Sequence, residues 1–70
     1  MPLMLAPVGE TVIIVKLAGD EKTKKHLENL GLVAGGEVKV LSRTGGGVVV
    51  SVKESRLALD SDLAAHIRVA

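Results

Sequence analysis

The chain contains no cysteine and no Phe, Tyr or Trp. Without cysteine it can form neither a disulfide nor a thiolate metal centre, and the composition is compatible with a reducing cytoplasm. Without aromatic side chains it lacks the flat faces on which bases, proline-rich peptides and methylated cations stack. These two absences argue against a disulfide-stapled secreted domain, a single-stranded nucleic-acid reader and an aromatic recognition groove.

A strong net charge is also missing. Nine Lys and Arg residues stand against eight Asp and Glu residues, which leaves a formal net charge of +1. Proteins that bind phosphate backbones usually carry a clear basic surplus, so the balance disfavours a nucleic-acid partner. The opposing hypothesis, a small barrel that binds RNA or DNA, would rely on a few basic residues: Lys22, Lys24, Lys25, Arg43 and Arg56.

Long apolar runs are absent as well. The apolar start from Met1 to Val8 is short, contains two prolines and lacks a basic residue, so we expect neither a signal peptide nor insertion into a membrane. The 70 residues suffice for one domain, residues 1–70, with a core of Val, Leu, Ile and Ala. The composition therefore predicts a single soluble intracellular domain.

What the chain does contain is a series of short strand patterns. Thr11 to Leu17 is rich in branched apolar residues, which is typical of a strand covered on both faces. Four further strands are expected at 37–43, 48–52, 56–59 and 66–69. Five short strands in so few residues predict a mainly β fold with one inserted α-helix, a small and strongly bent SH3-like antiparallel barrel.

The inserted helix has recognisable ends. Asp20 can cap its first turn, and the helix is expected to run to about Leu30. Gly31 then falls where a left-handed residue is wanted, and Leu32 can contact Leu27 as in a Schellman ending. The segment from Leu27 to Val40 therefore specifies architecture and carries no reactive group.

Glycines mark the other turns. Gly35 lies in the bend after the helix, and Gly45, Gly46 and Gly47 are expected to supply positive backbone dihedrals to a hairpin. The triplet joins two strands and lacks the Lys-Ser/Thr that follows in a phosphate-binding loop. Near the end of the chain, Asp60 is expected to cap one helical turn.

Reactive groups are few and scattered. No serine or threonine has the strand-to-helix elbow of an activated nucleophile, and the carboxylates occur singly at turns and strand ends, so we expect no enzyme. His26 and His66 are the only imidazoles, and His26 has no histidine or carboxylate four residues away on its helix. The sequence predicts no catalytic residue and no required cofactor, with at most a weak iron or zinc site at these two histidines.

Five fragments in order resemble the FeoA family of ferrous iron transport: Pro7-Val8-Gly9-Glu10, Leu27-Glu28-Asn29-Leu30-Gly31-Leu32, Ala34-Gly35 before Val38-Lys39-Val40, Leu57-Ala58-Leu59, and Leu63-Ala64-Ala65-His66-Ile67. The resemblance covers nearly the whole chain. Two departures concern turns: Ala34 stands where the family commonly has proline, and Val8 separates Pro7 from Gly9. From these departures we expect a looser bend and a changed approach to the first strand.

The resemblance implies a small cytoplasmic SH3-like protein that supports FeoB, the membrane ferrous iron transporter. On this basis we expect a noncatalytic adaptor, and the partner would contact the end of the helix and the bend after it: Lys25, His26, Asn29, Leu32 and Val33. The alternative is a stand-alone metal-responsive domain related to the carboxyl-terminal domain of iron-dependent repressors. Chelation or metal addition would separate the two.

The strand patterns also leave a surplus of apolar residues on what would be the outer faces, namely Val12, Ile14, Leu41 and Val49. Such a surplus is explained equally by a partner, by a homodimer, or by the apolar amino-terminal segment folding over these side chains. The sequence leaves these three explanations open.

Overall fold

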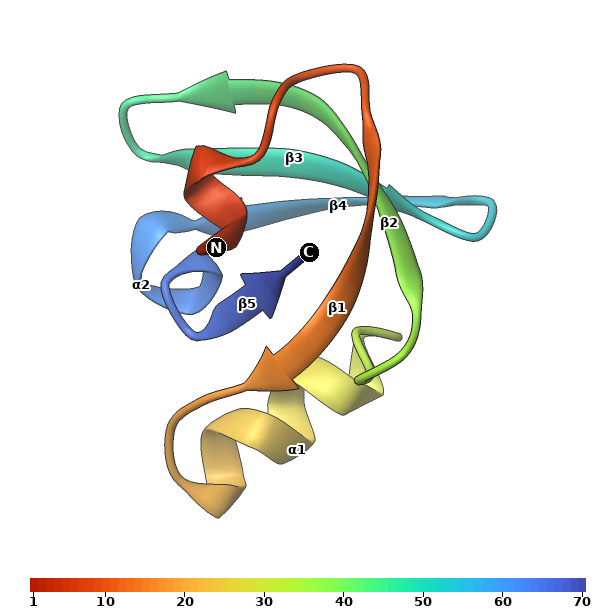
Figure 1. Cartoon of the computed structure of the whole chain (residues 1–70). Coiled ribbons are helices and arrows are strands. Elements are labelled where there is room, and N and C mark those ends of the chain that lie inside the picture. Colours follow the sequence, from red (N-terminus) through yellow and green to blue (C-terminus); the bar gives the residue numbers. More distant parts are fainter.

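Figure 1 shows the computed structural model of the protein, which describes all 70 residues. The elements are η1 (Leu3–Leu5, a 3₁₀ turn), β1 (Thr11–Leu17), α1 (Glu21–Asn29), β2 (Glu37–Thr44), β3 (Gly47–Val52), β4 (Ser55–Asp60), α2 (Ser61–Ala64) and β5 (Ile67–Val69). From β1 to β5 this is the predicted order. The turn η1 was not predicted.

All five strands belong to one antiparallel sheet with the order β4-β3-β2-β1-β5. Its long strands curve around the interior, and α1 closes one end beyond the tip of β1 (Figure 1). The register shifts between Ile14 and Lys16 in β1 and between Val40 and Ser42 in β2, and such bulges increase the bend of a sheet. The predicted mainly β, SH3-like fold is confirmed.

The core contains sixteen apolar side chains, and no polar or charged side chain is buried. Its largest fully buried members are Leu3, Ile14, Leu27, Leu32, Ile67, Val38, Val40, Val50 and Val69. In a 70-residue domain this aliphatic core is the principal source of stability, because neither a disulfide nor an aromatic cluster supplements it.

The prediction for β1 was wrong about its faces. Val12 and Ile14 belong to the core, whereas Ile13 and Val15 are 39% and 52% exposed. A strand of alternating branched residues does not reveal which side faces inward, and the bulge after Ile14 returns Leu17 to the core as well. Val12 and Ile14 therefore need no partner to cover them, while Leu41 and Val49 are half-buried.

The amino-terminal segment is part of the core. Leu3 and Ala6 are fully buried, and the Arg43 guanidinium on β2 donates hydrogen bonds through Nη1 to the carbonyl oxygens of Met4 and Ala6. The segment also extends the sheet, because the amide of Val69 donates to the carbonyl of Met1 over 2.7 Å. The amino-terminal segment therefore contributes its own side chains to the core, and the apolar surplus at Val12 and Ile14 is explained by their inward direction.

The predicted helix ends are confirmed for α1. The Asp20 carboxylate accepts the amide of Thr23 over 2.8 Å. At the other end Gly31 has φ +94°, its amide donates to the Glu28 carbonyl over 2.9 Å, and the amide of Leu32 donates to the Leu27 carbonyl over 3.0 Å. These two bonds complete a Schellman motif. The predicted cap of α2 is also present, from the Asp60 carboxylate to the amide of Leu63.

The hairpin predicted at the glycine triplet is present between β2 and β3, but the positive backbone dihedrals predicted for its glycines are absent. Left-handed glycines occur at Gly9, Gly19, Gly31 and Gly35, and none of the residues 45–47 is among them. Gly47 is required for space instead, because a Cβ there would collide with the carbonyl oxygen of Leu59 on β4. The role predicted for Gly35 is confirmed.

Both departures from the family pattern fall in closed turns. Gly36 donates to Val33 across Ala34 and Gly35, and Glu10 donates to Pro7 across Val8 and Gly9. In each turn the third residue is a left-handed glycine, which is the requirement of a type II turn. The proline favoured at the second position is therefore dispensable here, and neither turn is opened by its absence.

Candidate functional site

The predicted contact surface lies at the carboxyl end of α1. Lys25, His26 and Asn29 are exposed on its last turns, and Val33, which follows the helix, is 44% exposed. Leu32 does not contribute, since its side chain is fully buried as the hydrophobic contact that ends the helix. We refer to Lys25, His26, Asn29 and Val33 as the helix-end surface.

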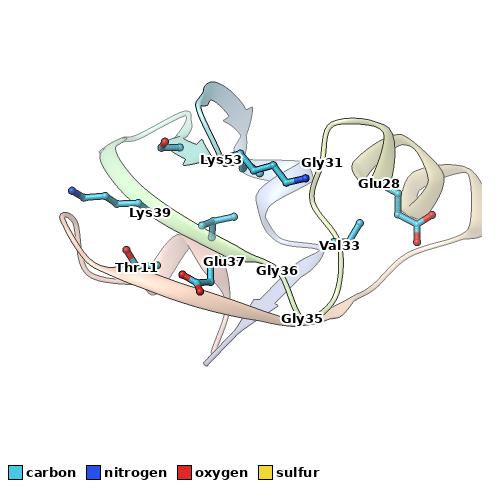
Figure 2. Close-up of a pocket in the computed structure, with 12 residues that line it drawn as sticks. Thr11, Glu28, Gly31, Val33, Gly35, Gly36, Glu37, Lys39 and Lys53 are labelled. Carbon is cyan, nitrogen blue, oxygen red and sulfur yellow. The ribbon is translucent and has the colours of Figure 1, made fainter.

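An open hollow of about 760 Å³ adjoins this surface. It lies between the end of α1, the turn before β2 and the β3–β4 turn, and Val33 and Gly31 belong to its wall (Figure 2). Its charged residues are of both signs, Glu28 and Glu37 against Lys39 and Lys53. A hollow of this composition suits a contact with a mixed polar surface more than the enclosure of a small apolar ligand.

Lys53 is held in an uncommon conformation at the rim of the hollow. It is the only non-glycine residue with a positive φ, at +57°, and Figure 2 shows its side chain extending toward Gly31 at the end of α1. The tip of β3 lies against the same place, because a Cβ on Gly31 would be 3.5 Å from Val52 Cγ1. The Lys53 ammonium thus approaches the end of α1 that carries partial negative charge.

The histidines do not form a metal centre within this structure. No group of three or more His, Asp or Glu side chains is arranged to hold a metal ion. His26 is exposed on α1, and the half-buried His66 has its Nδ1 atom 2.7 Å from the carbonyl oxygen of Asp62. Its ring covers Gly19, where a Cβ would lie 2.8 Å from Cδ2, so the place of His66 is explained by packing.

Asp20 is the one titratable group with a clear shift. The hydrogen bond from the backbone amide of Thr23 holds the pKa of its carboxyl below the ordinary value of 3.8, with a further contribution from the Thr23 side chain and a smaller one from the nearby charge of His66. The cause is a helix cap on an exposed carboxylate. The shift therefore reports on the start of α1 and marks no proton-transfer site.

Two exposed apolar residues next to the helix-end surface, Ile13 and Val15, were not predicted from the sequence. The amide of Gly35 donates to the Ile14 carbonyl, and the amide of Ile14 donates to the Gly36 carbonyl. These bonds place β1 beside the turn that follows Val33, so the exposed Ile13 and Val15 lie on the strand next to that turn. Ile13 and Val15 can be recognised as exposed only when Ile14 is known to face the core. The sequence of β1 does not give this direction, because apolar residues occupy both of its faces.

None of the helices is long and apolar enough to cross a membrane.

Comparison with known proteins gives one family and one fold. The family model described as the FeoA domain matches residues 1–70. A protein of Methanocaldococcus jannaschii, provisionally named Fe(2+) transport protein A, is 34% identical over 68 residues, which cover 97% of this chain and 83% of that protein. A crystal structure of an iron uptake regulatory protein, FeoA, has a TM-score of 0.91 at 28% identity and covers 99% of this chain and 93% of that one.

The same fold occurs inside a larger protein. A manganese-dependent transcriptional repressor matches with a TM-score of 0.89 at 21% identity, covering 99% of this chain but 40% of the repressor. At this level of identity the likeness concerns the fold alone.

Proposed function

This chain belongs to the FeoA domain family, and from that membership we propose that it is a noncatalytic accessory protein of ferrous iron transport, which acts in the cytoplasm by binding a FeoB-type membrane transporter. Its relation to Fe(2+) transport comes from the family. The binding role, the partner and the compartment are the proposal.

The observation that carries the proposal is the helix-end surface itself. Lys25, His26 and Asn29 are presented by a helix that is capped at one end and closed by a Schellman motif at the other. Val33 is held between that motif and a type II turn. Since the backbone beneath these side chains is hydrogen-bonded on both sides, a partner would meet a preorganised surface and little ordering entropy would be lost on binding.

The neighbouring hollow supports the same role. Residues of both charges line it beside the exposed Val33, and a small apolar centre with a polar rim is the usual composition of a protein contact. His26 is the only imidazole among the supporting residues, and they include no group of three or more side chains arranged to hold a metal ion. We therefore assign them to recognition of another protein by shape and charge.

The direct test is a titration of ¹⁵N-labelled protein with the cytoplasmic G-domain of a FeoB-type transporter. We expect amide shifts at the helix-end surface and at Lys53, and little change on β4. Absence of shifts between Lys25 and Val33 would contradict the proposal. If the amide shifts occur on another face of the protein, the partner is correct and the helix-end surface is not the place where it binds.

A pair of variants on one helix sharpens this test. Lys25→Glu should weaken binding at least about tenfold, because it reverses a charge within the proposed contact. Lys22→Glu makes the same change at another exposed position of α1 outside the proposed surface, and it should leave the affinity within about twofold. Equal effects of the two changes would indicate nonspecific attraction.

The likeness to a repressor domain supports a second candidate, a metal-responsive module with the same fold. Thermal unfolding with and without ferrous or zinc ion separates the two. A metal-responsive module should gain stability from the ion and lose that gain in His26→Ala or His66→Ala. For the adaptor, addition of the ion should leave the unfolding temperature of each protein, wild type or variant, unchanged.

A further inference from the structure

The two edges of the sheet are treated differently. The order β4-β3-β2-β1-β5 places β4 and β5 at the edges. The edge of β5 is covered by the amino terminus, because Val69 exchanges hydrogen bonds with Met1 and Arg68 forms a bridge with Pro2. Strand β4 pairs with β3 on one side and with no strand on the other. One edge is thus closed and the other is open.

The turn before β4 determines which of its backbone groups are free. Lys53 and Glu54 form a two-residue connection between the paired residues Val52 and Ser55. In such a hairpin the closing pair exchanges both hydrogen bonds, and hydrogen-bonded pairs then alternate along the ladder. Ser55, Leu57 and Leu59 therefore bond to β3, and Arg56, Ala58 and Asp60 direct their backbone groups away from it.

The side chains of these three residues are also accessible. Arg56, Ala58 and Asp60 are all exposed, and the backbone groups of Arg56 and Ala58 take part in no hydrogen bond outside the regular elements. Asp60 is the N-cap of α2, so its carbonyl oxygen already accepts the first bond of that helix and would use its second lone pair in a further pairing. Unpaired edges of this kind are templates for a further strand. No proline or bulge occurs in β4 to prevent it.

We propose that β4 pairs antiparallel with β4 of a second copy, centred on Ala58, so that two sheets become one across a twofold axis. In this register Ala58 lies opposite Ala58 of the other protomer, and Arg56 lies opposite Asp60. Residues that lie directly opposite each other must have their side chains on the same face of the sheet. This condition is met, because the side chains of Arg56, Ala58 and Asp60 all lie on the exposed face. The free backbone groups of the two strands meet each other in this register and in no register shifted by one residue.

Charge complementarity selects a second copy as the occupant. The twofold axis places each Arg56 guanidinium beside an Asp60 carboxylate of the other protomer, so the strand is complementary to itself. The Asp60 Oδ1 atom is used by the amide of Leu63, which leaves Oδ2 for the arginine. The two Ala58 side chains would meet on one face of the joined sheet without crowding each other.

There is room beside this contact. A hollow of about 390 Å³ borders Asp60 and is lined by Val49, Ala58 and Leu63 among others. The Arg56 side chain of the other protomer would lie over it and cover part of its apolar wall with its aliphatic stem. The interface remains small, so we expect a reversible dimer that forms with rising concentration and does not persist on dilution.

The register can be tested by NMR on the full chain. In the proposed pair Leu57 and Leu59 of opposite protomers form the non-hydrogen-bonded pair, in which the Hα atoms are closest. A mixed sample of labelled and unlabelled protein should therefore give an isotope-filtered NOE between Leu57 Hα and Leu59 Hα, which are too far apart along one strand. Dilution should shift the amides of Arg56, Ala58 and Asp60 and remove the NOE.

Three variants test the contact by sedimentation equilibrium, with circular dichroism as a check on folding. Ala58→Pro removes an outward N–H without affecting the ladder to β3 and should weaken self-association at least about tenfold. Arg56→Glu and Asp60→Lys should each weaken it to a similar extent, and an equal mixture of the two should associate again, since both cross-strand pairs become complementary.

Recovery in the mixture distinguishes a direct pairing from a folding defect. The proposal is overturned if the wild type stays monomeric up to about millimolar concentration, because a dimer with a dissociation constant in the micromolar range would then be almost fully formed. It is also overturned if the dimer shows shifts elsewhere, or if the mixture fails to associate. If β4 binds an extended segment of another protein and the chain does not self-associate, the strand that pairs with the open edge does not come from a second copy, and the proposal is overturned.

Discussion

The amide of Gly36 donates a hydrogen bond to the carbonyl oxygen of Val33 over 3.0 Å. This bond closes the turn between α1 and β2 and thereby places Val33 beside the hollow. Ala34 occupies the second position of the turn and Gly35, with φ +89°, the third. The amide of Ala34 makes no hydrogen bond outside the regular elements, so nothing in the turn depends on it.

From this geometry we expect Ala34→Pro to stabilise the protein. Proline suits the second position of a type II turn and restricts the unfolded chain, which typically raises the free energy of unfolding by about 0.4–1 kcal/mol. Urea unfolding of both proteins would measure the difference. A loss of stability would show that the turn is not of type II.

The matched change in the same turn is Gly35→Ala, for which we expect the opposite sign. A Cβ at Gly35 would meet no atom within 4 Å, so the cost is purely that of a left-handed backbone, about 1 kcal/mol. A neutral result would indicate that the turn can adopt another conformation.

The glycines of the β2–β3 hairpin should differ sharply from one another. Gly46→Ala should change the free energy of unfolding by less than about 0.5 kcal/mol, because its backbone is not left-handed and a Cβ would meet nothing within 4 Å. Gly47→Ala should cost about 3 kcal/mol or more, because the Cβ would collide with the backbone of β4. Thermal unfolding of the two variants checks this, and similar values would contradict the packing described here.

Stability should fall in acid partly through Asp20. The pKa of its carboxyl is lowered in the folded protein by the Thr23 amide, so its contribution is complete above the ordinary value of 3.8 and is lost as the pH falls through the lower folded value. Asp20→Asn retains a capping oxygen but no titration. Urea midpoints measured from neutral pH downward should therefore fall less steeply for this variant, and parallel curves would exclude the cap as the cause.

Arg43 should anchor the amino terminus. Arg43→Ala removes the donors to the Met4 and Ala6 carbonyls and should cost about 1–2 kcal/mol. Hydrogen exchange should accelerate at Leu5 and Ala6, whose amides form the bonds of η1. Arg56→Ala at low micromolar concentration is the control, because the Arg56 side chain makes no hydrogen bond within the chain. Equal exchange in both variants would contradict the anchor.

The parts that the sequence predicted correctly depend on local chemistry. Asp20 and Asp60 cap helices because their carboxylates reach amides three residues ahead. Gly31 ends α1 because only glycine adopts its backbone conformation freely. Val49 was placed on the outer face of β3 correctly, because its outward neighbour Ser51 is polar, and the structure buries Val48, Val50 and Val52.

The parts that were missed depend on contacts distant in sequence. The inward face of β1 is set by its pairing with β2 and β5 and by its bulge, so Ile13 and Val15 could not be recognised as exposed. Leu32 was placed in the contact surface although the Schellman contact that the sequence predicted requires it to be buried. The turn η1 is joined to β2 through Arg43, 37 residues beyond Ala6, and no local pattern contains that bond.

The hydrogen bonds that join Met1 to Val69 bring the two termini together on one edge of the sheet. A short flexible linker could therefore connect Ala70 to Met1, and new ends could be opened at the exposed Lys53–Glu54 turn without removing a core residue. A circularly permuted chain of this kind would begin with β4 and end with β3. The same packing of strands and helices could therefore form from a chain that starts at another point. Because the two termini are adjacent, the domain could also be inserted into a surface loop of another protein.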